Sequence, residues 1–361
     1  MTETSNQTEA FDLPSIVDME LGDPAPIFAL PDADGETVGL NDDLFAGRPM
    51  ILMFLSGPQD ADAMAALAAF NAEAASFAEA QAMVIAIAPA PQAAIADFAR
   101  QLGLNLVILA DADAATARAY QVKSPGATVF VLDGNRRVES IMKDIPADIM
   151  PAAALEIVRE LTAARPAETL SGTAPVLIVP NVLSAEECRW LISLYEQTGQ
   201  SWRHPDRVDE GGFAEDFKVP APDQGRVDRV DHVINDSDVL NHLATRINRR
   251  VLPEIEKAFH YPVTRREYWR ITSYEGRRGG QTIGHRDNPT EEYAHRRFAI
   301  SINLNSEEFE GGELMFREFS DQRFKPPSGA ALVFSSGILH EAQEVTAGRR
   351  MVLLSQLFGE R

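Results

Sequence analysis

Two histidines and an aspartate in the C-terminal half of the sequence have the types and spacing of a metal site. His285 and Asp287 are two residues apart, and His340 follows the apolar run at 330–334. Residues i and i+2 of an extended strand point to the same side, so imidazole and carboxylate can face one point. If His340 ends a neighbouring strand, the three side chains form a facial triad that suits Fe(II) and leaves positions open.

The His-x-Asp pattern also has a purely structural interpretation. Asp287 precedes Asn288 and Pro289, so a surface turn in which the carboxylate caps the backbone would account for it as well. The segments that surround and follow the motif favour the metal site instead. Short segments with polar turns between them predict strands at 298–305, 310–316, 329–334 and 351–358. Such a series is typical of a double-sheet jelly roll.

On these residues the sequence resembles the prolyl 4-hydroxylase-type 2-oxoglutarate/Fe(II) dioxygenases. The resemblance covers about 175–360 and rests on Tyr274-Glu-Gly, the His-Arg-Asp motif, Asn-Leu-Asn at 303–305, Glu-Gly-Gly-Glu-Leu at 310–314, His340 and Arg350. It implies a double-stranded β-helix (jelly roll) with supporting helices, and His285, Asp287 and His340 as ligands of Fe(II). It also implies hydroxylation of a C–H bond by O2, with 2-oxoglutarate converted to succinate and CO2.

The resemblance further implies three residues that bind 2-oxoglutarate. Arg350 would hold the distal carboxylate, because a guanidinium offers a bidentate fork. Arg349 is adjacent, and only one of two neighbouring residues on a strand can point inward; family spacing favours Arg350. Tyr274 matches a tyrosine of the cosubstrate pocket, with core packing as the alternative, and Asn303 takes a position where some relatives carry another tyrosine.

The substrate stays open at this stage. The family points to a prolyl or other peptidyl residue, hydroxylation of a small molecule by the same mechanism is the alternative, and L-ascorbate is a candidate additional reductant. Two other classes are also kept: a hydrolase using the triad with zinc, and a non-catalytic binding protein whose first domain is the working part.

The length of 361 residues predicts two domains. Between 21 and 164, apolar strands alternate with helical patterns: strands at 49–55, 83–88, 106–109 and 127–132, and helices at 60–80, 91–102, 113–120 and 147–164. This alternation predicts an α/β domain whose sheet is mostly parallel and covered on both faces.

This first domain resembles the peroxiredoxin branch of the thioredoxin fold. The resemblance rests on the opening at 21–30, the strand Met-Ile-Leu-Met-Phe-Leu at 50–55 and the segment at 124–138. Peroxiredoxins carry their peroxide-attacking cysteine after that strand, and the region 58–64 here has none. Since no thiolate is available, we expect a thioredoxin-like module without peroxidase activity. It could bind a partner, form a homodimer, recruit substrate or serve as a structural appendage.

Residues 165–175 have the composition of a linker, which makes 176–360 the dioxygenase domain. Its start reads as a strand at 176–183 followed by a capping box, Ser184 to Glu187, that opens a helix. The polar composition of 203–236 predicts a loop that could cover or define the substrate cleft. The apolar spacing of 237–258 predicts an amphipathic helix that supports the jelly roll from outside.

The net charge, the cysteine count and the N-terminal segment limit the classes of partner and the cellular location that we expect. The net charge of −21 argues against nucleic acid and anionic membranes as partners. The single cysteine, Cys188, allows no internal disulfide, and the acidic N-terminus lacks the pattern of a signal peptide. We therefore expect a cytoplasmic protein.

The remaining histidines and the arginines near the metal motif have no comparable spacing. We expect the histidines to be surface or helix residues: His204, His232, His242, His260 and His295. The arginines could attract 2-oxoglutarate or an acidic substrate, although a solvated strand face explains them equally: Arg265, Arg266, Arg270, Arg277, Arg278, Arg286, Arg296 and Arg297.

Overall fold

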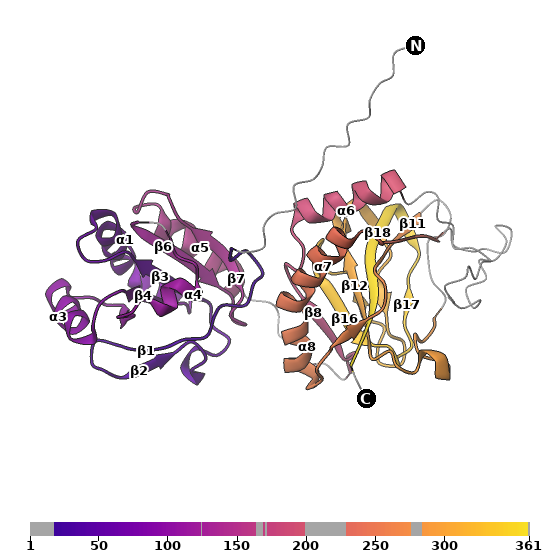
Figure 1. Cartoon of the computed structure of the whole chain (residues 1–361), viewed down its shortest axis with the longest axis horizontal. Helices are drawn as coiled ribbons and strands as arrows, with labels where there is room; N and C mark the ends of the chain where they lie inside the picture. Colours follow the sequence, from indigo (N-terminus) through magenta and orange to yellow (C-terminus); the bar gives the residue numbers. More distant parts are fainter. Residues whose placement is uncertain are drawn as a thin grey trace, which may run out of the picture. The chain divides into compact units, whose positions relative to one another are not determined.

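The computed structural model describes residues 18–123, 125–163, 169, 172–198, 229–275 and 284–359. The chain divides into two compact units, one formed by the described residues up to 163 and the other by those from 169 onwards. Most of the expected linker and most of the expected loop at 203–236 lie outside the described residues. Figure 1 shows both units with their elements labelled.

The N-terminal unit contains a five-stranded sheet in the order β5-β4-β3-β6-β7. Its elements are β1 (Ala29–Pro31), β2 (Thr37–Gly39), β3 (Met50–Leu55), α1 (Ala61–Ala72), α2 (Ala74–Glu79), β4 (Met83–Ala88), α3 (Gln92–Leu102), β5 (Val107–Ala110), α4 (Ala115–Ala119), β6 (Ala127–Leu132), β7 (Val138–Met142) and α5 (Met150–Thr162). The expectation of a mostly parallel sheet was wrong. β3 is parallel to β4 and β4 to β5, whereas β6 runs antiparallel to both β3 and β7.

The central strand of this sheet is buried on both faces, as its unbroken apolar run predicts. Ile51 and Met53 pack with helices α1, α2 and α5, whereas Leu52 and Phe54 pack on the other face with Tyr120 and Phe130. The expected helix at 60–80 is two helices, because the chain turns at Glu73 between α1 and α2. These features give the thioredoxin-like fold expected for the unit.

The C-terminal unit has a large sheet in the order β8-β16-β12-β18-β11-β9 and a small one in the order β15-β14-β17. Its elements are β8 (Val176–Val179), α6 (Ala185–Thr198), β9 (Arg229–Val233), α7 (Ser237–Arg250), α8 (Leu252–Phe259), β10 (Arg265–Arg266), β11 (Arg270–Glu275), β12 (Phe298–Asn303), β13 (Phe309–Gly311), β14 (Leu314–Met315), β15 (Arg323–Phe324), β16 (Ala331–Ser335), β17 (Glu341–Ala342) and β18 (Val345–Phe358). Neighbouring strands in the described part of this unit pair antiparallel, and the two sheets form the expected jelly roll.

Helices α6, α7 and α8 lie on one side of the large sheet, and β17 of the small sheet lies on the other (Figure 1). The expected helix at 237–258 is interrupted at Val251, where α7 ends and α8 begins. The predicted capping box opens α6: the Ser184 amide donates to the Glu187 carboxylate at 2.7 Å, and the Glu187 amide donates to Ser184 Oγ at 3.1 Å.

A buried ionic cluster ties α6 to α7. The Glu187 carboxylate contacts His242 and accepts from Arg246 Nε at 2.6 Å, and all three side chains are about 2% exposed. Burial raises the pKa of Glu187, but hydrogen bonds from His242 and from the Ser184 amide outweigh it and lower the pKa to about 2. His242 is therefore a helix residue with a structural partner.

The long strand β18 divides the side chains of the large sheet between two environments. Met351, Leu353 and Leu357 belong to the core beneath the helices, together with Trp269 and Ile271. Since side chains alternate along a strand, the even-numbered residues of β18 face the small sheet. That inner face carries the side chains of β18 that line the candidate site, among them Arg350 and Gln356.

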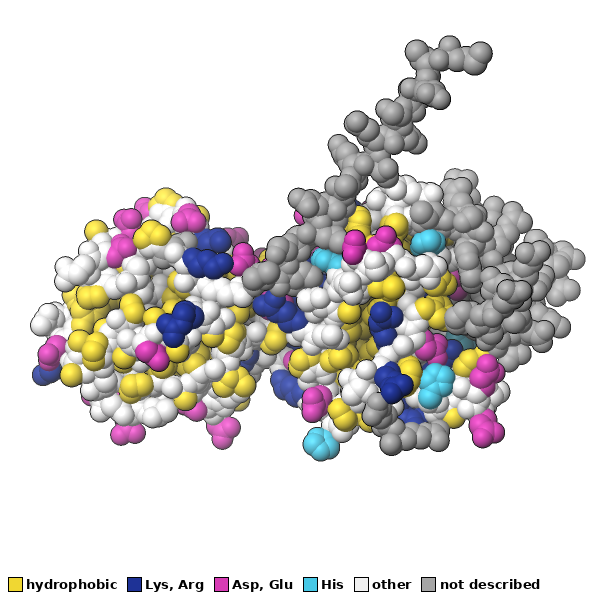
Figure 2. All heavy atoms as spheres, viewed as in Figure 1, with side chains coloured by type: hydrophobic (Ala, Val, Ile, Leu, Met, Phe, Trp, Pro, Cys, Tyr) yellow, Lys and Arg dark blue, Asp and Glu magenta, His cyan; other side chains and the backbone are white. Residues whose placement is uncertain are grey.

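On the face drawn in Figure 2, acidic and basic side chains are interspersed among apolar ones on both units. Among the helices that the structure describes, none is long and apolar enough to cross a membrane.

Candidate metal centre

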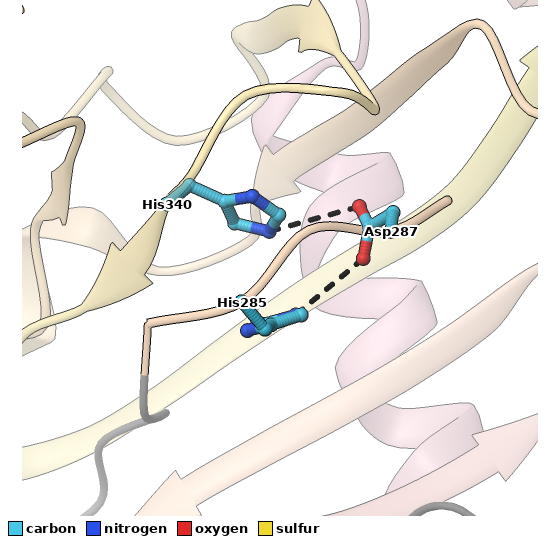
Figure 3. Close-up of side chains that lie close together, drawn as sticks. All are labelled: His285, Asp287 and His340. Carbon is cyan, nitrogen blue, oxygen red and sulfur yellow. Dashed lines mark ion pairs between the residues drawn. The ribbon is translucent and has the colours of Figure 1, made fainter. Parts of the chain in front are cut away.

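The structure brings His285, Asp287 and His340 together (Figure 3). One ligand atom of each residue lies within 4.8 Å of the other two. His285 Nε2 is 3.4 Å from Asp287 Oδ1, and His340 Nε2 is 3.6 Å from Asp287 Oδ2. Figure 3 shows both imidazoles turned toward the carboxylate from separate chain segments.

The backbone that positions these residues differs from the expected pair of strands. His285 and His340 form an isolated antiparallel bridge, in which each amide donates to the other residue's carbonyl at 3.0 Å. Asp287 lies in a bend, where its amide donates to the Ser336 carbonyl at 2.9 Å. A two-residue bridge and a bend therefore perform the alignment that the sequence assigns to longer strands.

The hydrogen bonds of His340 fix which nitrogen faces the centre. Its Nδ1 lies 3.1 Å from the Ile338 carbonyl, which is an acceptor, so Nδ1 carries the proton and Nε2 presents its lone pair. Burial lowers the pKa of this imidazole, against the opposing effect of Asp287. The ring is thus held neutral, which is the form that ligates a metal.

Asp287 is held as a carboxylate. Burial raises its pKa, but the hydrogen bond with His285 and that from Gln356 act in the opposite direction, and the net pKa lies well below its usual range. Gln356 Nε2 donates to Asp287 Oδ2 at 2.8 Å, and Gln356 Oε1 accepts from Ser336 Oγ at 2.9 Å. One ionised carboxylate and two imidazoles form a donor set that fits a mid-series divalent metal such as Fe(II).

The backbone of Asp287 is anchored as well. Arg296 Nη1 donates to the Asp287 carbonyl at 2.9 Å, and Arg296 pairs with Glu267 through Nε–Oε1 at 2.6 Å and Nη2–Oε2 at 2.9 Å. His295 Nε2 lies 2.9 Å from the same Glu267. Arg296, with His295 and Glu267, therefore stabilises the backbone at Asp287. The interpretation of Arg296 as part of a solvated strand face was wrong.

Arg350 lies on the inner face of β18 and is 3% exposed. Its guanidinium carbon is 5.2 Å from the centre of the Tyr274 ring, and Nε is 3.3 Å from Asn303 Oδ1. Gly312 has a φ of +69°, and a Cβ there would lie 3.0 Å from Arg350 Cδ, so the second glycine of the Glu-Gly-Gly-Glu-Leu segment leaves room for this side chain. Arg349 points the other way and pairs with Glu196.

A pocket joins the triad to Tyr274 and Arg350. Asn303 is not part of its lining; its amide instead contacts Arg350 and donates to the Pro326 carbonyl at 3.2 Å. The structure thus places Asn303 beside Arg350, and its direct contact with 2-oxoglutarate stays a prediction.

The pocket residue Gln356 was not singled out from the sequence, and Arg270 was named only among the arginines that could attract 2-oxoglutarate or an acidic substrate or lie on a solvated strand face. Alternation along β18 places Gln356 on the same face as Arg350, and alternation along β11 places Arg270 on the same face as Tyr274. Both could have been found from the strand assignment, but their contacts with other strands could not.

The remaining arginines and histidines lie outside this pocket or outside the described residues. Arg286 points away from the triad and pairs with Glu318 at 2.5 Å. Arg277, Arg278 and His204 lie outside the described residues. His260 ends α8 and is exposed, and His232 is half-buried on β9.

Comparison with protein families identifies a domain in each unit. Residues 21–141 match the AhpC/TSA family, and residues 269–355 match the 2OG-Fe(II) oxygenase superfamily. The second match contains the triad, Tyr274 and Arg350. A 2OG-Fe(II) oxygenase domain supports a 2-oxoglutarate-dependent dioxygenase, and the expected combination with a thioredoxin-like domain is confirmed.

Solved structures similar to the chain align with its N-terminal part. They include peroxidoxin BcpB from Mycobacterium tuberculosis, with 26% identity, a TM-score of 0.37, and coverage of 40% of this chain and 98% of the mycobacterial one. Peroxiredoxin Q from Xanthomonas campestris has 18% identity, a TM-score of 0.36, and coverage of 40% and 97%. A putative thiol:disulfide interchange protein DsbE from Chlorobium tepidum has 25% identity, a TM-score of 0.35, and coverage of 39% and 97%. No curated protein matches the chain.

Proposed function

We propose that the C-terminal unit, residues 176–360, hydroxylates a C–H bond with Fe(II) held by His285, Asp287 and His340, using 2-oxoglutarate and O2. The observation that carries this proposal is the convergence of three ligand atoms within 4.8 Å at one end of a pocket that also contains Arg350. Bound Fe(II) would supply the coupling of O2 reduction to decarboxylation of 2-oxoglutarate, with succinate and CO2 as products.

The protein's own residues would prepare the site. His340 and Asp287 offer a neutral nitrogen and an ionised oxygen without further proton transfer, because their pKa values are both lowered. Gln356 fixes the rotation of the carboxylate by donating to Oδ2. The two-residue bridge fixes the separation of the histidines.

Arg350 would bind the distal carboxylate of 2-oxoglutarate. Its burial favours a strong charge-assisted bond, since water screens a buried pair less than an exposed one. Tyr274 lies beside the guanidinium and would line the same subsite. Asn303 would limit the rotation of the arginine through its contact with Nε.

For the substrate we propose only two alternative classes, whereas the reaction type is a single proposal. A prolyl or other peptidyl residue and a free small molecule both remain candidates, and L-ascorbate as an additional reductant stays a prediction. For the first unit, residues 21–164, we propose a binding or assembly role, because Asp60 occupies the region where the family cysteine would be expected.

The test of this function is binding and turnover of 2-oxoglutarate by the full chain. Calorimetry with Mn(II) in place of Fe(II) should show 2-oxoglutarate binding that depends on the metal. Fe(II) and O2 should then support succinate formation, and Zn(II) should not. Succinate formation that is independent of the metal, or no metal-dependent binding of 2-oxoglutarate, would contradict the proposal. Hydrolytic turnover with Zn(II) would favour the hydrolase instead.

The substrate can be sought separately. Mass spectrometry of a host lysate, incubated with the Fe(II)-loaded chain and with the Asp287→Ala variant as control, should reveal products that gain one oxygen atom. A product found with the wild type alone would identify the substrate, and its mass would separate a peptide from a small molecule.

A further inference from the structure

A second arginine, Arg270, lines the pocket that contains the triad and Arg350. Its neighbours in the chain, Trp269 and Ile271, belong to the core beneath the helices. Alternation therefore turns Arg270 to the inner face of β11, where Tyr274 also lies. Its side chain is 20% exposed, so the solvated strand face considered for the arginines was wrong for this residue.

The hydrogen bonds of Arg270 do not use all the donors of its guanidinium. Nη1 donates to the Tyr268 hydroxyl at 3.3 Å, whereas the buried Nε has no hydrogen-bond acceptor among the residues that the structure describes. The carboxylate of Asp231 is 3.8 Å from Nε, and its Oδ1 accepts from Thr272 Oγ1 at 2.7 Å. A buried N–H without an acceptor is costly, so a ligand that supplies an acceptor would be stabilised here.

The strand register separates Arg270 from the proposed cosubstrate subsite. Tyr274 is paired with Arg350, whereas Arg270 is paired with Leu354. The two arginines therefore start about 13 Å apart along the strands, from a rise of about 3.3 Å per residue. Gln356, which holds Asp287, follows Leu354 on the same face of β18. Arg270 thus flanks the metal end of the pocket, and Arg350 lies farther along it.

We propose that Arg270 is a specificity-determining residue that binds a carboxylate of the substrate close to the carbon to be oxidised. The substrate class is a small carboxylic acid or an acidic side chain of a peptide. This inference rests on the proposed oxygenase function. A single negative charge is favoured over a phosphate dianion because Asp231 already offsets part of the charge of Arg270, and a dianion would face that carboxylate.

Calorimetry with the full chain tests the proposal, with Mn(II) in place of Fe(II) and N-oxalylglycine as an unreactive analogue of 2-oxoglutarate. The probes are matched pairs: N-acetylglycine against its amide, and capped tripeptides with a central Asp or Glu against those with Asn or Gln. At least one acidic probe should bind about tenfold more tightly than its neutral partner, as one charge-assisted bond predicts. The pair that responds distinguishes a free acid from a peptide.

The Arg270→Gln variant should lose this preference and keep its affinity for N-oxalylglycine. Arg270→Lys should keep part of the preference, and it serves as the second variant if the glutamine variant does not fold. Arg265→Gln is the control, since Arg265 is exposed on β10 and does not line the pocket.

Two outcomes would overturn the inference while leaving the oxygenase function intact. One is a wild type that binds N-oxalylglycine but prefers no acidic probe. The other is an Arg270→Gln variant that loses N-oxalylglycine affinity, which would assign Arg270 to the cosubstrate. A wild type that binds neither Mn(II) nor N-oxalylglycine would overturn the oxygenase function, and this inference with it.

Discussion

Each unit has one aspartate at the position where the function of its family would be expected, Asp60 in the N-terminal unit and Asp287 in the C-terminal unit. The groups that contact their carboxylate oxygens differ. In the N-terminal unit, Asp60 accepts from Ser56 Oγ at 2.7 Å and from the amides of Gly126, Asp62 and Ala63 at 2.8, 3.0 and 3.1 Å. In the C-terminal unit, Asp287 accepts from Gln356 and faces the Nε2 atoms of two histidines.

This difference separates a structural carboxylate from one that we propose as a metal ligand. The oxygens of Asp60 are used by four donors of its own unit, so this side chain caps α1 and joins it to the segment before β6. Asp287 instead keeps its oxygens directed toward nitrogens that are themselves potential ligands. Burial alone would raise the pKa of both carboxyl groups. At Asp60, hydrogen bonds from its own unit lower the pKa instead. At Asp287, His285 and His340 lower the pKa together with Gln356.

The largest effect is expected when the ligand set is broken. Asp287→Ala or His340→Ala should abolish metal-dependent succinate formation, because each removes one of three ligands. Calorimetry with Mn(II) and circular dichroism should show lost metal binding with secondary structure retained. A His340→Ala variant that binds Mn(II) and turns over 2-oxoglutarate normally would contradict the proposed triad.

Arg350 should have the next largest effect. Arg350→Ala removes a buried charge-assisted bond of about 1.5–3 kcal/mol, so the affinity for 2-oxoglutarate should fall by roughly one to two orders of magnitude. Mn(II) binding should change little, and Arg350→Lys should restore part of the loss. Arg349→Ala is the matched control, since this half-exposed neighbour pairs with Glu196. A damaging Arg349→Ala beside a silent Arg350→Ala would reverse the assignment.

Gln356 tests how far the carboxylate of Asp287 depends on its donor. Gln356→Met has a similar length but cannot donate, and metal affinity should fall by about tenfold, as is common for residues that hold a ligand. Ser336→Ala, one bond farther away, should have a smaller effect because Gln356 itself remains. Equal metal affinities for wild type and Gln356→Met, measured by Mn(II) calorimetry, would show that Asp287 needs no such positioning.

The sequence predicts the parts of both units that follow from local patterns. Unbroken apolar runs locate β3 and β6, and the Ser184–Glu187 pair locates the start of α6. The direction of β6 could not be predicted, because an apolar run buried on both faces looks the same in parallel and antiparallel pairing. The break at Glu73 falls inside a continuous helical pattern without Gly or Pro. The break at Val251 does have a sequence signal, since Pro253 lies in the first turn of α8 and cannot donate to the preceding turn.

For the site, spacing and strand alternation bring His285, Asp287, His340 and Arg350 to one pocket. The contribution of Gln356 depends on a cross-strand contact to a bend, and that of Arg270 on which neighbouring side chains fail to reach its Nε. Such contacts depend on the register between segments far apart in sequence, which a single sequence does not specify.

Asp60 should affect stability and leave oxygenase turnover unchanged. The hydrogen bond from Ser56 is the main cause that lowers the pKa of Asp60 from 3.8 to about 2. A lowered folded-state pKa stabilises the fold above the ordinary value, and this contribution is lost as the pH falls from about 4 through about 2. Asp60→Ala should lower the Tm at pH 7 and weaken its dependence on acid pH, with Asp60→Asn in between. A thermal-melt series would contradict this if the variants matched the wild type.

The smallest expected effect is on hydrogen peroxide, which the full chain should not consume with a thiol reductant. The region 58–64, where the family places its cysteine, has none, and Asp60 caps the helix there. The single cysteine, Cys188, lies on α6 in the other unit and is 2% exposed, and burial raises the pKa of its thiol to about 12. Its thiolate is therefore too scarce at neutral pH to attack peroxide. Peroxide loss should equal that of buffer and be the same for Cys188→Ser, whereas consumption that disappears in Cys188→Ser would show a reactive thiol in the oxygenase unit.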